Sequence, residues 1–177
     1  MAASFYFYLW PPPPPNHRPM SSARYPALAL FLLATFAAAA LGSAATFPSV
    51  NTWYLTLVKP SWTPPGWLFG PVWTILYVAM SIAGWRAWRK SDGPSRRGVL
   101  IVYATQLTLN ALWSVLFFGL RRPGLALVDI LLLWTVLILA LVRYGRADRL
   151  AGFLWAPYVA WVSFASALNA AIWWLNR

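Results

Sequence analysis

The stretch Gly98–Leu120, GVLIVYATQLTLNALWSVLFFGL, runs for 23 residues without a charged side chain. Because a helix rises about 1.5 Å per residue, about 20 apolar residues cross the hydrocarbon core of a bilayer. Four further runs are of this kind, one of them broken only by Asp129: Pro26–Ala45, Trp67–Trp85, Pro123–Val142 and Leu150–Asn176. The sequence therefore predicts an all-α membrane protein, a bundle of five transmembrane helices. We expect these helices in one membrane domain, 26–177, at about 26–45, 67–88, 98–120, 123–142 and 150–176.

The composition excludes the other broad classes of protein. Of the 177 residues, 60% are hydrophobic and 10% are charged, whereas a soluble globular domain has about 25% charged residues. An ordinary soluble enzyme is therefore excluded, and so is a disordered chain, because there is ample apolar surface to bury. A transmembrane β-barrel is excluded because its strands alternate polar with apolar side chains, whereas these segments are apolar on every face.

Chemical groups that serve catalysis are scarce in this chain. There are no cysteines, and the single histidine, His17, precedes the first predicted helix. We therefore expect no metal site, no resident cofactor and no axial haem ligand within the bundle. The sequence also lacks a carboxylate pair, a Ser-His-Asp arrangement and a phosphate-binding glycine loop, so a binding protein is favoured over an enzyme.

The first 25 residues have a different composition, with five consecutive prolines at 11–15. A polyproline run forms neither a helix nor a sheet, so we expect 1–25 to be a disordered tail. Met20 is an alternative start of translation, which would remove 1–19. A secretory signal peptide at 20–45 is a second interpretation, but its apolar run is long for one, and a retained first helix is favoured.

The basic residues indicate how the helices are oriented. With five helices, the N-terminus and the second and fourth loops share one side of the membrane, which holds ten of the 14 Lys and Arg residues. The positive-inside rule places this side, and with it the N-terminus, in the cytoplasm. Because topology and lipid headgroups account for the formal charge of +11, no nucleic-acid partner is expected.

Loop 1, at 46–66, is the only long connection and reads TFPSVNTWYLTLVKPSWTPPG. Its tryptophans, Trp53 and Trp62, suit an anchor at the lipid headgroups. A long loop stiffened by prolines such as Pro64 and Pro65 equally suits a lid over a cavity between the helices. The residues alone leave both interpretations open.

Polar and aromatic side chains share faces of the predicted helices. They recur at helical spacing within each segment: Trp73 and Tyr77; Gln106, Asn110, Trp113 and Phe117; Trp161, Ala165 and Leu168. Amides and small residues at such positions also serve helix–helix packing, which stays an alternative for each residue alone. The 13 tryptophans of the chain favour a ligand site, because rigid aromatic walls with a few amides suit a large planar apolar ligand.

Asp129 is the only acidic residue at membrane depth. It follows Gly124 by about one helical turn, which places it near the edge of the bilayer. Because an isolated charge is unfavourable there, we expect a structural role, in which Asp129 pairs with Arg121, Arg122 or a neighbouring helix.

Four motifs occur in order along the chain: KPSWTPPGWLFGPVWTILY (59–77), QLTLNALWSVLFFG (106–119), ALVDILL (126–132) and PYVAWVSFASALN (157–169). Together they resemble the TspO/MBR family of tryptophan-rich sensory proteins and translocator proteins, also known as peripheral-type benzodiazepine receptors. The resemblance extends over about 26–176, and several long motifs in one order argue against chance.

The resemblance implies a compact five-helix bundle, often a homodimer, with a ligand cavity for which loop 1 is the lid. Family ligands include porphyrins such as protoporphyrin IX, sterols and synthetic benzodiazepine-type compounds. The family's cavity residues correspond here to Trp73, Asn110, Trp113, Trp161 and Ala165. Light-dependent breakdown of protoporphyrin IX, reported for some bacterial members, is attributed to the positions of Trp73 and Trp161, which makes them the candidate photochemical pair.

The chain departs from the animal members of the family at two places. Ala170 and Ala171 stand where the sterol motif has tyrosines, and Leu125 stands where animal members have a tryptophan. These departures favour a bacterial-type member, in a bacterial cell membrane, over a sterol-binding one. We therefore expect an integral membrane receptor or regulator that binds, senses or moves tetrapyrroles. The alternatives are an enzyme of light-driven porphyrin breakdown and a transporter of small apolar ligands or sterols.

Overall fold

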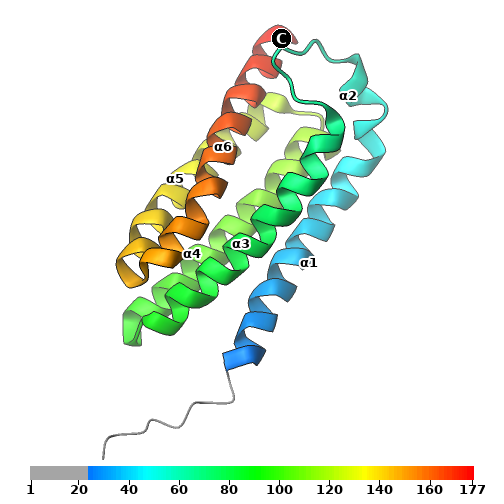
Figure 1. Ribbon diagram of the computed structural model, residues 1–177. Coiled ribbons are helices and arrows are strands. Elements are labelled where there is room, and N and C mark those ends of the chain that lie inside the picture. The colour runs from blue at the N-terminus through cyan, green and yellow to red at the C-terminus, as the bar shows by residue number, and fades with distance from the viewer. Residues whose placement is uncertain (1–23) are drawn as a thin grey trace, which may run out of the picture.

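The computed structural model describes residues 24–177 (Figure 1). The expectations of a proline-rich tail and of an alternative start at Met20 concern residues outside the described range, except for residues 24 and 25. Those two residues are helical, so the first helix begins two residues before the predicted position 26.

Five long helices form the bundle, and short helical turns occupy its connections (Figure 1). In chain order the elements are α1 (Arg24–Val50), α2 (Trp53–Thr56), the 3-10 turn η1 (Gly66–Leu68), α3 (Phe69–Lys90), α4 (Gly93–Ser114), the π-helical turn η2 (Val115–Gly119), α5 (Pro123–Ala147) and α6 (Arg149–Leu175). Residues 24–177 contain no strand. The five candidate membrane spans are 25 to 27 residues long and apolar, which is enough to cross a bilayer. The prediction of an all-α, five-helix membrane protein is confirmed, and the chain is an integral, multi-pass membrane protein.

Several helices run beyond the charge-free stretches that predicted them. α1 continues to Val50 instead of ending near 45, so that Pro48 lies in its last turn and loop 1 is shorter than 46–66. α5 continues to Ala147, because Arg143 and Arg146 can extend their charged ends toward water while their backbone stays helical. Absence of charge therefore marks the part of a helix inside the bilayer and not its ends.

The α5–α6 hairpin is the tightest contact between helices. A single non-helical residue, Asp148, separates the two helices. Near this turn, a Cβ added to Gly152 would lie 2.8 Å from the Cα of Gly145, so only glycine at 152 allows the backbones to approach this closely. Such small residues at crossings are typical of membrane helices, because close approach maximises packing.

The other side of the bundle is joined by a buried hydrogen-bond triad. α1 packs against α3 and α4 (Figure 1), and the triad lies where these three helices meet. The Ser81 hydroxyl donates to Thr35 Oγ1 at 3.0 Å, and the Tyr103 hydroxyl lies within hydrogen-bond distance of both. Beside it, Gly84 leaves the space that the Tyr103 ring fills. These polar groups satisfy one another, as membrane depth requires.

Candidate functional site

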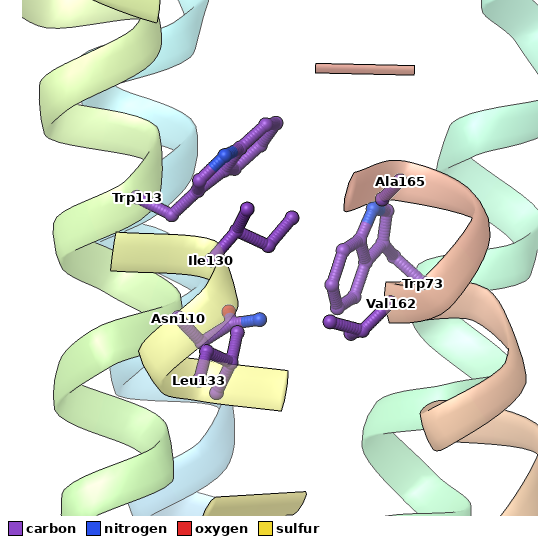
Figure 2. Close-up of a pocket in the computed structure, with 7 residues that line it drawn as sticks. All are labelled: Trp73, Asn110, Trp113, Ile130, Leu133, Val162 and Ala165. Atoms are coloured by element: carbon purple, nitrogen blue, oxygen red, sulfur yellow. The ribbon is translucent and has the colours of Figure 1, made fainter. Parts of the chain in front are cut away.

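A small cavity lies in the middle of the bundle, between α3, α4, α5 and α6. Its volume is about 10 Å³, room for roughly one water molecule. Seven side chains line it: Trp73, Asn110, Trp113, Ile130, Leu133, Val162 and Ala165. Figure 2 shows the α4 and α5 residues on one wall and Trp73, Val162 and Ala165 on the other. Four of the residues that the sequence places at the ligand site thus line one cavity: Trp73, Asn110, Trp113 and Ala165.

The amide of Asn110 is the polar group on this lining. Its Nδ2 donates to the Tyr158 hydroxyl at 3.0 Å, and the Tyr77 hydroxyl lies 3.5 Å from its Oδ1. The Tyr158 hydroxyl donates in turn to Gln106 Oε1 at 3.1 Å. Gln106 is fully buried and does not line the cavity. Its amide joins α4 to α6, which is the packing role that the sequence left open.

Aromatic rings build the two facing walls. Trp73 on α3 has Tyr77 at 5.2 Å and Tyr158 at 6.0 Å between ring centroids. Trp113 on α4 stacks on Phe117 at 5.2 Å with an interplanar angle of 27°. Such pairs each add about 0.5–1.5 kcal/mol beyond the burial of their area, so they hold the walls in place.

Trp161 lies beside the cavity and not on its lining. Its ring contacts Phe69 and Phe164, with centroids 5.7 Å and 5.6 Å away. Its buried indole Nε1 has no hydrogen-bond partner among residues 24–177. A buried donor without a partner is unfavourable by about 1–3 kcal/mol, so this N–H is available to an acceptor that enters from outside the chain.

The rotation of α6 about its axis determines which of its side chains face the cavity. Tyr158, Val162, Ala165 and Asn169 lie on one stripe at i, i+4, i+7 and i+11, and this stripe faces the other helices. The pattern read from the sequence ran along Trp161, Ala165 and Leu168. Ala165 lies on the observed stripe, and the other two are each one position away from it. The hydroxyl of Tyr158 and the amide of Asn169, two groups that need partners inside a bilayer, are the sequence signal that marks the true face.

Phe117 and Leu168 belong to a second cluster, at the loop 1 end of the bundle. The π-helical turn η2 begins two residues after Trp113, and it contains Phe117. There Phe117 contacts Trp53 of α2 at 5.8 Å. Trp113 packs against both clusters, so this side chain separates the cavity from the residues under loop 1.

Loop 1 is fastened to the C-terminal end of α6. The Val58 N–H donates to Asn176 Oδ1 at 3.0 Å, and Asn176 Nδ2 donates to the Val58 carbonyl oxygen at 2.9 Å. Trp62 contacts Phe164 at 5.8 Å but is 48% exposed. Pro64 and Pro65 directly precede η1, where the chain enters α3. The loop therefore covers this end of the bundle through one two-bond clasp and a few ring contacts.

The expected pairing of Asp129 with Arg121 or Arg122 is wrong. Its side chain is buried, at 4% exposure, but it makes no ion pair with Arg121 or Arg122, and its Oδ2 has no hydrogen-bond partner among the described residues. The pair does not form because the side chains point in different directions. Asp129 faces the interior of the bundle, whereas both arginines are exposed near the start of α5.

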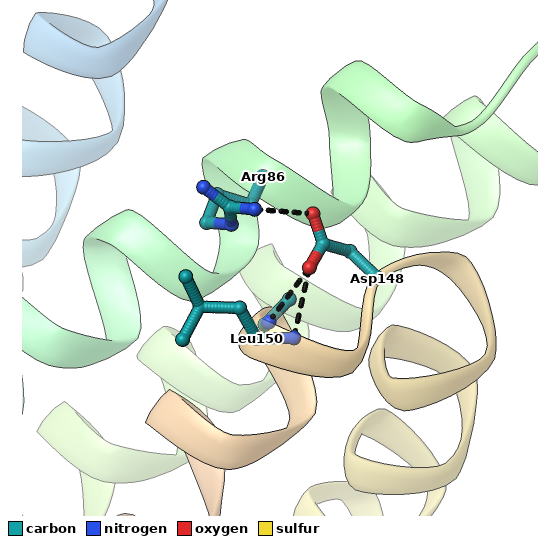
Figure 3. A network of polar contacts seen from close by, with 4 residues as sticks. Arg86, Asp148 and Leu150 are labelled. Carbon is teal, nitrogen blue, oxygen red and sulfur yellow. Dashed lines mark hydrogen bonds and ion pairs between the residues drawn. The ribbon is translucent and has the colours of Figure 1, made fainter.

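The ion pair that the described residues do form lies at the opposite end of the bundle (Figure 3). Arg86 Nη2 donates to Asp148 Oδ2 at 2.8 Å, and Asp148 Oδ1 accepts from the backbone N–H groups of Leu150 and Ala151. Burial acts to raise the pKa of Asp148, but the hydrogen bonds from Arg86 and from these two amides outweigh it and hold the pKa below its usual value. This carboxylate caps α6 and fixes the α5–α6 turn to α3.

Comparison with known proteins agrees with this architecture. The chain matches the model of the TspO/MBR family over residues 30–175. It is 46% identical to the tryptophan-rich protein TspO of Archaeoglobus fulgidus over 145 residues, which are 82% of this chain and 94% of the relative. It is 42% identical to the tryptophan-rich protein TspO of Chlorobaculum tepidum over 156 residues, 84% of this chain and 95% of the relative. The translocator protein of Homo sapiens is 42% identical over 123 residues, 68% of this chain and 73% of the relative. The resemblance seen in the sequence motifs is confirmed.

Proposed function

This chain belongs to the TspO/MBR family, and we propose that it is a membrane receptor or regulator that binds a tetrapyrrole such as protoporphyrin IX. The observation that carries the proposal is the aromatic cavity, in which Trp73 and Trp113 stand on facing walls and the amide of Asn110 lies on the same wall as Trp113. Flat aromatic faces bind a planar apolar ring by stacking, and a few convergent polar groups orient it.

Binding requires the cavity to widen. Pockets for ligands of drug size are roughly 300–1,000 Å³, against about 10 Å³ here. In the proposed open form the ligand enters beneath loop 1, and the unpartnered N–H of Trp161 donates to one of its acceptors. Its carboxylates then reach the cations at the same end of the bundle, Lys59 or Arg177, with which charge-assisted hydrogen bonds form.

The lining favours binding over acid–base chemistry. None of the seven side chains in Figure 2 titrates near neutral pH, so none of them can act as a general acid or base there. A second candidate function is light-driven breakdown of the bound porphyrin, because Trp73 lines the cavity and indoles are oxidisable neighbours for an excited ring. Trp73 and Trp161 would then donate electrons to the excited ring, and net oxidation of the porphyrin would use dissolved dioxygen as the oxidant. Transport of the same ligand is a third candidate function, and a binding measurement alone does not distinguish it from the other two.

The test is quenching of tryptophan fluorescence by protoporphyrin IX, with purified protein in lipid nanodiscs, first in the dark and then under illumination. We expect saturable quenching, with an affinity weakened about 2- to 10-fold in Trp73→Leu and Trp161→Leu, since each change removes an aromatic contact of about 0.5–1.5 kcal/mol. Trp88→Leu, at the far end of α3, is the matched control and should bind like the unmodified chain. Thermal melting of each variant checks that the fold is kept.

Each outcome of this experiment is decisive. Equal affinity of all three variants and the unmodified protein would disprove the assignment of the cavity. Loss of the porphyrin absorbance only in the light, and only with both tryptophans present, would support the photochemical function. Net porphyrin flux into vesicles would support transport.

Orientation and assembly are part of the proposal. We propose that the N-terminus faces the cytoplasm of a bacterial cell and that the protein forms a homodimer. Because the chain has no cysteine, single substitutions report topology cleanly. In intact cells a membrane-impermeant maleimide should label Ser61→Cys in loop 1 and leave Ser95→Cys, at the start of α4, unlabelled. The reverse pattern would invert the assignment, and a monomeric mass in nanodiscs would contradict the dimer.

A further inference from the structure

A second and larger hollow opens at the loop 1 end of the bundle, where the start of α5 meets the end of α6. Its volume is about 490 Å³. We call it the arginine groove, because Arg121, Arg122 and Arg177 line it together with Trp173 and Asn176. We propose that this groove binds the phosphate of an anionic phospholipid headgroup.

The first argument is charge. The groove lining contains three arginine side chains and no Asp or Glu. Among the described residues, Arg86 and Asp148 form the ion pair, at the other end of the bundle, so the groove cations make none. Three guanidinium groups around one concave space repel one another, and an anion bound between them relieves that repulsion through charge-assisted hydrogen bonds.

The second argument is the N-terminus of α5, which forms one side of the groove. The helix starts at Pro123, with Arg122 as its N-cap, and no side chain caps it. The first backbone hydrogen bond of this turn runs from the Ala126 N–H to the Arg122 carbonyl, so the N–H groups of Gly124 and Leu125 precede it. An N-terminus of this kind carries partial positive charge and free donors, which adds to the attraction of the arginines for an anion.

The third argument selects a lipid over a soluble anion. Leu125 and Trp173 line the groove and are 56% and 38% exposed, and Trp174 beside it is 61% exposed. In a bilayer such apolar surface at the end of a transmembrane helix faces the acyl chains and the headgroup boundary. The Arg177 guanidinium lies 3.1 Å from the centre of the Trp174 ring, a stacking that leaves its edge donors free. A ligand with a phosphate and an apolar chain fits both surfaces.

Two backbone features shape the groove. A Cβ on Gly124 would lie 2.8 Å from Trp173 Nε1, so this glycine lets the indole close against α5. Arg121 has a φ of 54°, the left-handed region that favours glycine. Glycine at 121 therefore removes the charge while keeping the backbone conformation, which makes Arg121→Gly a substitution that the turn tolerates.

The experiment is native mass spectrometry of the purified full chain released from nanodiscs of mixed phosphatidylglycerol and phosphatidylcholine. The test variants are Arg121→Gly with Arg122→Gln, and Arg177→Gln alone. The matched control is Lys90→Gln with Arg97→Gln, which removes two charges from exposed positions at the opposite end of the bundle. We expect preferential retention of phosphatidylglycerol by the unmodified protein, reduced about tenfold or more by the double groove variant and unchanged in the control.

Three results would overturn the proposal. One is equal retention of the two lipids by the unmodified protein, and another is equal loss in the groove and control variants, which would reflect net charge alone. The third is displacement of phosphatidylglycerol by millimolar inorganic phosphate, which would assign the groove to a free anion. Reduced retention in Arg177→Gln alone supports the proposal even if the double variant fails to fold, because this change lies at the exposed end of the chain.

Discussion

Removal of the clasp between loop 1 and α6 should open the lid without unfolding the bundle. The clasp consists of two hydrogen bonds between the Asn176 side chain and the backbone of Val58, at 3.0 Å and 2.9 Å. Asn176→Ala deletes both. A net contribution of about 0.5–1.5 kcal/mol for each bond, taken at its lower end because the pair is exposed, gives about 1–2 kcal/mol. That difference raises the open population of the loop by roughly 5- to 30-fold.

Hydrogen exchange measures this population directly. The Val58 amide is protected while its N–H donates to Asn176, so it should lose this protection in Asn176→Ala nanodiscs. The other amides of residues 55–63 report the opening of the loop, and their exchange rates should rise by the factor given above. Thr56→Ala is the matched control, because the Thr56 hydroxyl bonds to the Trp53 carbonyl within α2 and takes no part in the clasp. The association rate of protoporphyrin IX should rise with the exchange rate if the ligand enters beneath loop 1.

Any of three results would refute the reasoning. Unchanged exchange over residues 55–63 in Asn176→Ala would mean that ring contacts, and not the clasp, hold the loop. Equal acceleration in Thr56→Ala would mean that the loop responds to any local change. A loss of global stability, seen as a lower melting temperature, that is large enough to account for the faster exchange would show global unfolding instead of lid opening.

Two further changes test the other end of the bundle. Gly152→Ala should destabilise the fold by about 1–3 kcal/mol through overpacking and so lower the melting temperature, because its Cβ would lie 2.8 Å from the Gly145 backbone. Gly145→Ala is the control and should be neutral or stabilising, because its Cβ would lie 3.9 Å from its nearest neighbour. Equal effects of the two changes would contradict the close crossing. Asp148→Asn should lower stability at pH 7, and the difference from the unmodified protein should disappear as the pH falls below about 4. The folded-state pKa of Asp148 is depressed, so its stabilisation exists above the unfolded-state pKa and is lost on acidification; a difference constant from pH 7 to pH 3 would exclude the Arg86 pair as its cause.

The fold was predictable because a bilayer imposes a simple rule on sequence. Charge-free runs such as Gly98–Leu120 predict the number and order of the helices, since a charge in the hydrocarbon core is unfavourable. Helix ends follow weaker rules. α1 passes through Pro48, although a proline gives up one helical hydrogen bond. α5 passes Arg143, because a long cationic side chain reaches water from inside the bilayer edge.

The candidate site was predictable in part. The sequence pattern of Trp161, Ala165 and Leu168 includes one residue of the cavity lining, Ala165. The hydrogen bonds of Tyr158 and Asn169 set the rotation of α6, which leaves Trp161 and Leu168 beside this lining. Asp129 was assigned a partner by proximity in sequence, but a helix position fixes direction as well as distance. The clasp of Val58 to Asn176 joins residues 118 apart, a separation at which local patterns carry no information.

The hydrogen bonds around the cavity identify which wall can move. Trp113 Nε1 donates to Asn169 Oδ1 at 2.9 Å, and Asn169 Nδ2 donates to the Pro123 carbonyl at 2.9 Å. The Trp113 wall is therefore tied through α6 to the start of α5, and any shift of it breaks bonds inside a low-dielectric core. The opposite edge, toward Trp161 and Phe69, is held by ring contacts, which are weaker individually and less directional. The cavity should thus widen on the loop 1 and α3 side, while the start of α5, which also walls the arginine groove, stays in place as the fixed frame.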